Sequence, residues 1–267
     1  SYVLPARIVT RNGDGMTVFL VGAGPGDPEL LTVRAARLIA EADVIVHDRL
    51  ADQAILDLAR ADVEFIDVGK KPGLPTPQEM INTLLVHLGS QGLNVVRLKG
   101  GDPYVFGRGG EEAQALIDAG IPFDVVPGIS SAVGVPAAAG IPVTHRNVSV
   151  GFTVVTGHRE KGGATSINWE ALAQVGGTIV VLMGVSERAE IASRLMSGGL
   201  AADTPVAAIR YGTRPEQTTI RTTLGELADA PLESPSTIVI GQVAAFDFSP
   251  TAGTSAWARK AGHASLD

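Results

Sequence analysis

From residue 17 onward, short runs of Val, Ile and Leu alternate with longer amphipathic stretches. The short runs are typical of buried strands, and the longer stretches are typical of helices that pack on a sheet. In the first half, strands are expected at 17–21, 43–47, 63–68 and 94–99, with helices at 29–42 and 77–88. The order predicts an α/β fold with a largely parallel sheet, because parallel strands need a crossover between them.

Two helix starts carry specific signals. Asp27 is a candidate N-cap, followed by Pro28 at the first helical position and an acid in the first turn. Residues 76–79, with the sequence TPQE, have the spacing of a capping box.

The second half of the sequence begins with a segment rich in proline and glycine. Residues 120–148 hold four prolines and four glycines around one expected helix at 130–139, and the domain hinge is expected at 143–149. Beyond it, strands at 151–155, 178–182, 204–209 and 237–240 alternate with helices near 169–174 and 186–196. An extra strand at 218–223 is expected to pair antiparallel. The predicted domains are therefore 17–146 and 147–248, with tails at 1–16 and 249–267.

Composition narrows the classes of function. The absence of cysteine excludes disulfides and Cys-ligated zinc and favours a cytoplasmic protein. No apolar stretch reaches the ~20 residues of a membrane span, and residues 1–16 have no secretion signal. A net charge of −7 argues against nucleic acid as partner. The five histidines show no metal-binding spacing, so neither a metal nor a membrane is expected.

The first candidate loop, VGAGPGDP at 21–28, lies between a strand and a helix. Glycines there let a ligand approach the main chain and the helix N-terminus. A dinucleotide fingerprint would need Gly or Ala at residue 27, where Asp27 stands instead. The segment is therefore either a ligand loop of another kind or a tight structural turn.

The second candidate loop, RLKGGDPYVFGRGGEE at 97–112, also joins a strand to a helix. Its many glycines make it costly to order, which is typical of functional loops. Asp102 could bind ribose hydroxyls or an amine, and Arg108 could bind a carboxylate through two hydrogen bonds. Glu111 and Glu112 could be acids that merely favour the helix dipole.

Two further segments, VPGISSA at 126–132 and GIPVTHR at 140–146, complete the set. Ser130 or Ser131 could simply cap a helix, and Arg146 could be either a ligand for an anion or a solvated linker residue. Asp48, Asp102 and Arg108 all follow predicted strands. Ligands of open α/β sheets bind at the carboxyl ends of strands, so these side chains are expected at one shared edge.

Together, these segments resemble the tetrapyrrole methyltransferase family. The resemblance spans about residues 17–246 and rests on VGAGPGDPELLT (21–32), ADVIVHDRL (42–50), LKGGDPYVFGRGGEE (98–112), VVPGISSA (125–132) and AGIPVTHR (139–146). It implies two α/β domains with the active site in the cleft between them, and a homodimer. It also implies S-adenosyl-L-methionine as methyl donor, S-adenosyl-L-homocysteine as product and no metal.

The resemblance assigns roles by matching motif positions. The cofactor site would be lined by Pro25, Gly100, Gly101, Asp102, Val105, Ser130, Ser131, Met183 and Gly212. The family's proton acceptor and donor fall on Asp48 and Lys70, and Arg108 would act as an anchor and electrostatic stabiliser. Arg49, Glu111 and Arg146 match residues that hold the tetrapyrrole. Family members often carry Thr-Ala in place of Ser130-Ser131, and a tyrosine is common where His47 stands.

Within the family, FGRGGEE together with GIPVTHR resembles the members that methylate uroporphyrinogen III at C2 and C7 to give precorrin-2, for sirohaem or cobalamin. That substrate carries eight carboxylates, so an acidic chain needs a local basic cluster. The candidates are Arg49, Lys70, Lys71, Lys99, Arg108, Arg146 and Arg210.

Three alternatives stay open: a methyltransferase for another precorrin, a 2′-O-ribose methyltransferase for ribosomal RNA, and a module that binds S-adenosylmethionine without turnover. Nothing in residues 1–16 resembles the remains of a dehydrogenase domain, which favours a stand-alone enzyme.

Overall fold

The computed structural model describes residues 18–48, 52–69, 77–157 and 167–249. It divides into two compact units, Ser1–Ser130 and Ser131–Asp267. This division falls earlier than the expected boundary after residue 146. The reason is that helix α5 (Ser131–Ala138) packs against strands β7 (Thr178–Leu182) and β10 (Ser236–Ile240) of the second unit.

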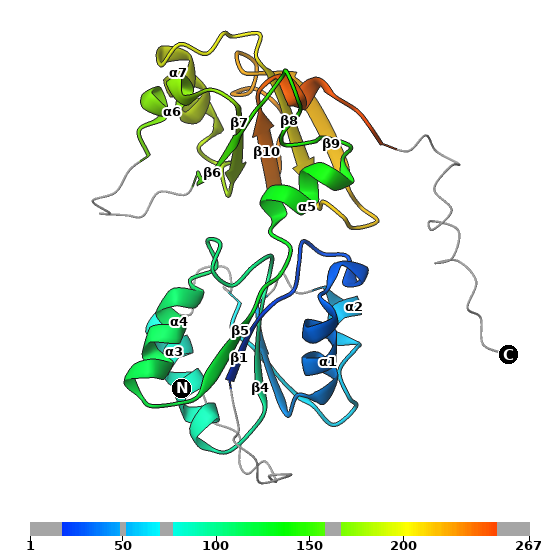
Figure 1. Cartoon of the computed structure of the whole chain (residues 1–267), viewed down its shortest axis with the longest axis vertical. Helices are drawn as coiled ribbons and strands as arrows, with labels where there is room; N and C mark the ends of the chain where they lie inside the picture. Colours follow the sequence, from blue (N-terminus) through cyan, green and yellow to red (C-terminus); the bar gives the residue numbers. More distant parts are fainter. Residues whose placement is uncertain (1–17, 49–51, 70–76, 158–166, 250–267) are drawn as a thin grey trace, which may run out of the picture. The chain divides into compact units, whose positions relative to one another are not determined.

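The first unit is a five-stranded sheet in the order β3-β2-β4-β1-β5, and each strand pair is parallel, as expected (Figure 1). The strands are β1 (Val18–Gly22), β2 (Val44–His47), β3 (Glu64–Asp67), β4 (Val95–Lys99) and β5 (Phe123–Val126). The helices are η1 (Pro28–Leu30), α1 (Val33–Glu41), α2 (Gln53–Leu56), α3 (Gln78–Ser90) and α4 (Gly109–Asp118).

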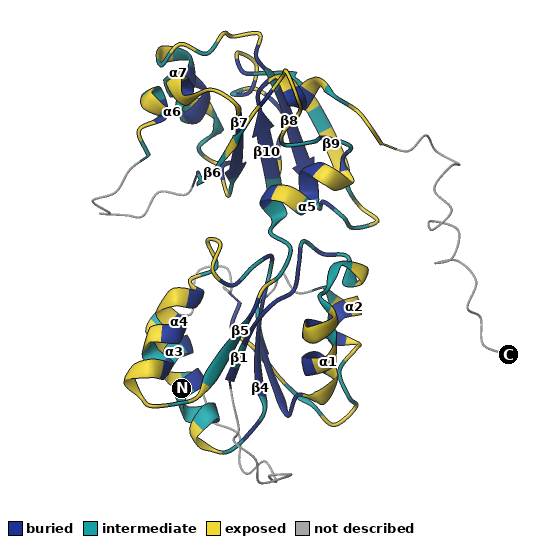
Figure 2. Ribbon diagram, viewed as in Figure 1, coloured by how far each residue is buried: buried dark blue, intermediate teal, exposed yellow. Residues whose placement is uncertain are grey.

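Alternate side chains of these strands enter two separate hydrophobic cores. Helices α1 and α2 cover one face, where Leu38 and Ile55 pack on Ile45 of β2. Helices α3 and α4 cover the other face, where Leu85 and Leu116 pack among the remaining apolar strand residues. Figure 2 shows the resulting pattern, with β4 buried and the helices exposed on their outer sides. A sheet covered on both faces explains the nearly continuous apolar strands of the sequence.

The second unit is also a five-stranded sheet, in the order β6-β7-β10-β8-β9. Its other strands are β6 (Phe152–Thr156), β8 (Pro205–Arg210) and β9 (Thr218–Thr223). Helices α6 (Trp169–Val175) and α7 (Arg188–Ser197) cover one face, and α5 with η2 (Gln242–Ala245) covers the other. Strand β9 pairs antiparallel with β8, which confirms the expected extra strand.

The structure corrects three local predictions. The helix expected at 29–42 is two elements: Asp27 caps only the short η1, and Thr32 starts α1 by accepting the Ala35 amide at 3.1 Å. Helix α3 has Pro77 at its N-cap without a side-chain hydrogen bond, and Thr76 of the predicted capping box lies outside the described residues. Strand β5 and the four-residue α2 were not predicted.

Candidate functional site at the strand ends

The loops after β1 and β4 are joined through their main chains. Gly24 and Gly101 form an isolated antiparallel bridge, with N–O distances of 2.7 and 3.2 Å. Strands β1 and β4 are neighbours, yet the helices that follow them, α1 and α4, lie on opposite faces of the sheet (Figure 1). This is the switch point of an open α/β sheet, where ligands bind.

The loop after β5 joins the same junction. A Cβ atom on Gly128 would lie 2.2 Å from the carbonyl oxygen of Gly101, and one on Gly22 would lie 2.5 Å from the Gly128 nitrogen. Both contacts are too short for a side chain, so only glycine allows the three segments to meet. The first three candidate loops therefore form one main-chain junction at the carboxyl end of the sheet.

Asp102 fastens this junction. Its two carboxylate oxygens accept the amides of Tyr104 at 2.8 Å and Gly128 at 3.0 Å. The sequence suggested a contact with ribose or an amine, whereas the carboxylate here orders the loop itself. Each oxygen keeps a second lone pair, so a ligand contact is still compatible with this geometry.

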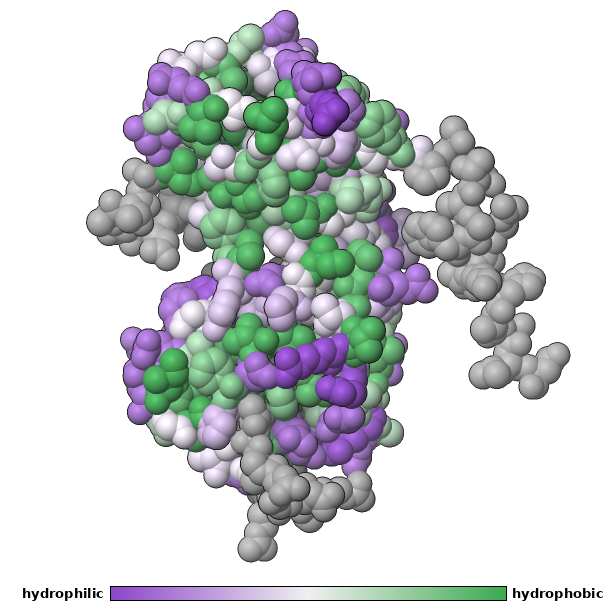
Figure 3. Space-filling view, viewed as in Figure 1, coloured by the Kyte–Doolittle hydropathy of each residue, from purple (hydrophilic) through white to green (hydrophobic). Residues whose placement is uncertain are grey.

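The glycine-rich loop then turns tightly into α4. The amide of Gly109 donates to the Pro103 carbonyl at 3.0 Å, and Cβ atoms at Gly107 and Gly109 would lie 2.7 and 2.4 Å from that oxygen. The apolar side chains of Tyr104, Val105 and Phe106 remain exposed in this turn. On the face of the protein drawn in Figure 3, hydrophobic residues lie beside hydrophilic ones at the surface. The loop thus offers apolar and main-chain contacts side by side.

Arg108 occupies the N-cap of α4 in a left-handed conformation, with φ 58°. Its Nε donates to the Glu111 carboxylate at 3.0 Å, and both side chains are more than half exposed. Partial burial acts to raise the pKa of Glu111, but hydrogen bonds from Arg108 and the main chain outweigh it, so that this pKa lies below its usual value. The two predicted site residues are therefore an ion pair, and neither Nη atom of Arg108 is hydrogen-bonded within the described part of the chain.

Strained backbone conformations coincide with the predicted site. The non-glycine residues with positive φ in the described part of the chain are Phe106, Arg108, Asn147, Met183, Tyr211 and Thr213. Arg108 and Met183 are themselves predicted site residues. Phe106 follows Val105, Asn147 follows Arg146, and Tyr211 and Thr213 flank Gly212. Such conformations cost about 1–3 kcal/mol each and cluster at functional sites.

In the second unit, predicted cofactor residues also follow strand ends. Strands β7 and β8 point the same way because each is antiparallel to β10. Met183 comes directly after β7, and Gly212 lies two residues after the end of β8. Gly212 packs on α5, since a Cβ there would lie 2.4 Å from Val135. Met183 is exposed, and Ser130 and Ser131 stand at the start of α5.

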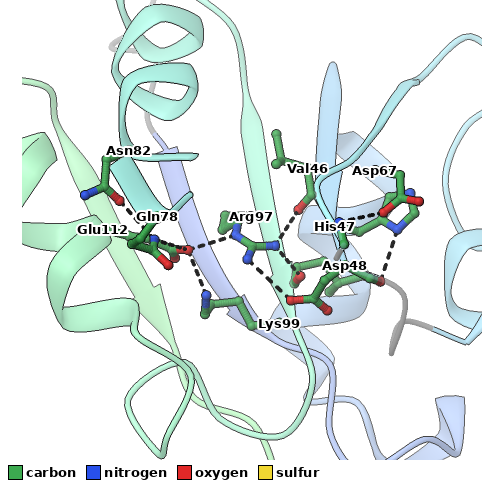
Figure 4. A network of polar contacts seen from close by, with 11 residues as sticks. Val46, His47, Asp48, Asp67, Gln78, Asn82, Arg97, Lys99 and Glu112 are labelled. Atoms are coloured by element: carbon green, nitrogen blue, oxygen red, sulfur yellow. Dashed lines mark hydrogen bonds and ion pairs between the residues drawn. The ribbon is translucent and has the colours of Figure 1, made fainter. Parts of the chain in front are cut away.

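Asp48 follows β2 and ends a buried chain of charges (Figure 4). Its Oδ2 lies 3.4 Å from Nη2 of Arg97, and its buried Oδ1 has no partner among the described residues. Arg97 is in turn bonded to Glu112, which also binds Lys99. Burial is the main reason that the pKa of Lys99 lies below 10.5, and Arg97 lowers it further, whereas Glu112 and Asp48 oppose the shift.

Some predicted residues are not brought together. Arg49 and Lys70, as well as Lys71, lie outside the described residues. Arg146 is described and exposed. Sequence reasoning missed Arg97 altogether and interpreted Glu112 only as a first-turn acid. The available signal was the charged pair Arg97 and Lys99 at alternate positions of an otherwise apolar strand.

The described residues show neither a membrane-spanning helix nor a metal-binding cluster. No described helix is long and apolar enough to cross a membrane. No group of three or more acidic or histidine side chains in the described ranges could hold a metal ion.

The first unit, a parallel sheet with glycine-rich loops at the carboxyl ends of its strands, defines a class of α/β protein that binds its ligand at that edge. The family model of tetrapyrrole (corrin/porphyrin) methylases matches residues 17–228. The chain belongs to this family and is a methyltransferase, which confirms the predicted fold class, family and enzyme class.

Individual relatives narrow the comparison. The S-adenosyl-L-methionine-dependent uroporphyrinogen III methyltransferase of Methanosarcina barkeri is 52% identical over 241 residues, which cover 87% of this chain and 93% of the relative. A sirohaem synthase of Thiobacillus denitrificans is 48% identical over 231 residues, 85% of this chain but 48% of the relative.

A solved structure agrees with them. The uroporphyrin-III C-methyltransferase of Thermus thermophilus, in complex with S-adenosylhomocysteine, is 42% identical with a TM-score of 0.75, covering 85% of this chain and 98% of that one. Its ligand agrees with the cofactor expected from the sequence.

Proposed function

We propose that the protein transfers methyl groups from S-adenosyl-L-methionine to C2 and C7 of uroporphyrinogen III and so produces precorrin-2, a precursor for sirohaem or cobalamin. The observation that carries this proposal is the 52% identity to the M. barkeri enzyme over most of both chains. The strand-end loops provide the setting that such a reaction needs.

The proposed cofactor site uses the main-chain junction. Pro25, Gly100, Gly101 and Asp102 surround it in the first unit, with Val105 next in the glycine-rich loop. A ligand rich in hydrogen-bonding groups can bind to main-chain amides and carbonyls there without side chains in the way. Ser130, Ser131, Met183 and Gly212 are the proposed cofactor residues from the start of α5 onward.

The substrate calls for cations as well as apolar contact. Uroporphyrinogen III is a macrocycle with carboxylate side chains, and arginine binds carboxylates through paired hydrogen bonds. Arg108, with the exposed apolar residues beside it, fits such a ligand. We assign Arg49, Glu111 and Arg146 to the same task, with Glu111 holding Arg108 until a substrate carboxylate competes for it.

In the reaction, the electron-rich pyrrole carbon forms a bond to the methyl group while the bond from methyl to sulfur breaks and S-adenosylhomocysteine leaves. The macrocycle has then accepted a methyl cation and must release a proton. Alignment of carbon, methyl and sulfur supplies much of the rate. We assign Asp48 as the proton acceptor and Lys70 as the donor, with Arg108 as an anchor that stays protonated.

The test is an anaerobic incubation with uroporphyrinogen III and ¹³C-methyl-labelled S-adenosylmethionine. We expect mass spectrometry to show two added methyl groups and ¹³C NMR to place them on C2 and C7. Methylation of another tetrapyrrole or of ribosomal RNA instead would show that this other molecule is the substrate. Binding of S-adenosylmethionine without transfer to any of these would indicate a binding module. Sedimentation analysis of the same sample tests the proposed homodimer.

A further inference from the structure

Arg97 occupies an unusual place for an arginine. It lies on β4, a central strand, on the face that α3 and α4 cover, two residues after the core residue Val95. Its side chain is 3% exposed. A buried charge is costly unless it is paired and hydrogen-bonded, so the contacts of this side chain indicate its purpose.

Three nitrogens of the guanidinium are all engaged, and in different directions (Figure 4). Nε donates to Glu112 at 3.1 Å, and Nη1 lies near the carbonyl oxygens of Leu98 at 3.1 Å and Val46 at 3.4 Å. Nη2 points to Asp48, 3.4 Å from Oδ2. Because a guanidinium is planar and rigid, its contacts with Glu112 and the two carbonyls fix the direction of Nη2.

Glu112 is itself held from the side away from Asp48. Its side chain is fully buried, and Oε1 accepts from Lys99 at 2.8 Å and from Gln78 at 3.3 Å, besides Arg97. Gln78 also donates to Asn82 at 3.0 Å, which ties the cluster to α3. The two cations and two carboxylates balance in charge. Because α3, α4 and β4 supply the contacts that hold Glu112, the fold itself fixes the orientation of Arg97.

The two oxygens of Asp48 therefore differ. Oδ2 is the atom next to Arg97, whereas Oδ1 is buried and has no hydrogen-bond partner in the described part of the chain. A base that takes a proton must be held in a fixed direction. The contact from Arg97 to Oδ2 supplies this constraint, because no other described side chain binds either oxygen.

We propose that Arg97 is a positioning residue for methyl transfer: through its contact with Oδ2 it fixes the direction of the Asp48 carboxylate, which accepts the proton that the macrocycle releases. This inference rests on the proposed function, in which Asp48 is the proton acceptor. Arg97 does not itself contact the reacting atoms.

The test compares Arg97→Lys with the wild type by labelled-methyl transfer. Lysine keeps the charge but lacks the fork, so we expect kcat to fall about tenfold, part of the roughly 10²–10⁴-fold that acid–base catalysis contributes. KM for both substrates and the Kd for S-adenosylhomocysteine should change less than about twofold, because they report binding rather than the proton-transfer step.

A double-mutant cycle separates positioning from a structural effect. If Arg97 acts through Asp48, the loss caused by Arg97→Lys should nearly vanish in the Asp48→Asn background, measured as single-turnover methyl transfer. Glu112→Gln is the second variant, because it weakens the anchor of Arg97 and keeps the shape. It should give a smaller loss in kcat that also vanishes with Asp48→Asn.

Arg60→Lys is the matched control. Arg60 pairs with Asp43 at 2.7 Å, at the opposite end of the same strand β2, and has no part in the proposed site. Additive losses in the cycle, losses confined to KM or Kd, or an equal loss in Arg60→Lys would each overturn the inference. Absence of methyl transfer to uroporphyrinogen III by the wild type would instead overturn the proposed function on which it rests.

Discussion

The carboxylate of Asp102 accepts the main-chain amide of Gly128, 26 residues further along the chain, at 3.0 Å. The contact joins the loop after β4 to the loop after β5. Asp102 is therefore important to the shape of the proposed cofactor site whether or not it touches the cofactor.

Asp102→Asn tests this role. The asparagine amide group must face one of the two main-chain N–H donors, so one of the two hydrogen bonds to the carboxylate is lost. We expect the free energy of unfolding to fall by about 1–3 kcal/mol in urea titrations, with a several-fold rise in the Kd for S-adenosylhomocysteine. The control is Asp52→Asn at the N-cap of α2, where asparagine caps as well as aspartate. Equal losses in both variants would contradict the prediction.

Gly128→Ala tests the junction of three main chains. The added Cβ would lie 2.2 Å from the Gly101 carbonyl oxygen, so the main chain must shift. We expect the free energy of unfolding to fall by about 1–3 kcal/mol and cofactor binding to weaken. Gly110→Ala is the control, because it has open space around its Cβ and lies in a helix. It should raise stability by about 0.5–1 kcal/mol.

Arg108→Ala should lower kcat/KM for uroporphyrinogen III about 10- to 100-fold, since a charge-assisted hydrogen bond contributes about 1.5–3 kcal/mol. Steady-state kinetics with each substrate varied in turn measures the change. Arg34→Ala, which removes an exposed pair with Asp124, should leave kcat/KM unchanged. An unaltered kcat and KM in Arg108→Ala would remove Arg108 from the substrate site.

The buried Lys99 predicts a pH dependence. Its pKa is lower in the folded protein than the 10.5 of an exposed lysine, so between these two values the unfolded chain binds more protons. The contribution of Lys99 to the free energy of unfolding therefore rises with pH across that window. We expect the stability of the wild type to increase with pH relative to Lys99→Met. A pH-independent difference between the two would show that Lys99 does not titrate abnormally.

Glu170 predicts a change of stability in the same direction with pH, but at low pH. A hydrogen bond from Arg194 lowers its pKa from 4.5 to about 2. Its contribution to stability is thus present above pH 4.5 and is lost as the pH falls toward 2. Urea unfolding of wild type and Glu170→Gln should differ at pH 7 and converge at about pH 2. Divergence on acidification would refute the assignment.

The sequence predicts most of the regular structure and the strand-end loops, because strand periodicity and glycine content are local signals. Strand β5 escapes because Asp124 interrupts its apolar pattern, and the early helix breaks because Thr32 caps α1 within the run. Neither effect follows from periodicity alone.

For the candidate site too, the sequence predicts the local features and misses the contacts between distant segments. Motif positions identify Asp48, Asp102 and Arg108, but no spacing shows that Asp102 binds main-chain amides or that Arg97 joins Asp48 to Glu112. Those contacts depend on which face of β4 each side chain occupies and on which helix covers that face. Only the folded sheet determines both.

The meeting of Gly24, Gly101 and Gly128 has a consequence for motion. Segments that touch through their main chains cannot open singly, because displacing one removes the packing of the others. Amide hydrogen exchange at the Gly24 and Gly101 bridge should therefore be nearly as slow as in β1 and β4, without ligand. The part of the proposed cofactor site that lies in the first unit is thus formed before the cofactor arrives, and binding requires little ordering of these loops.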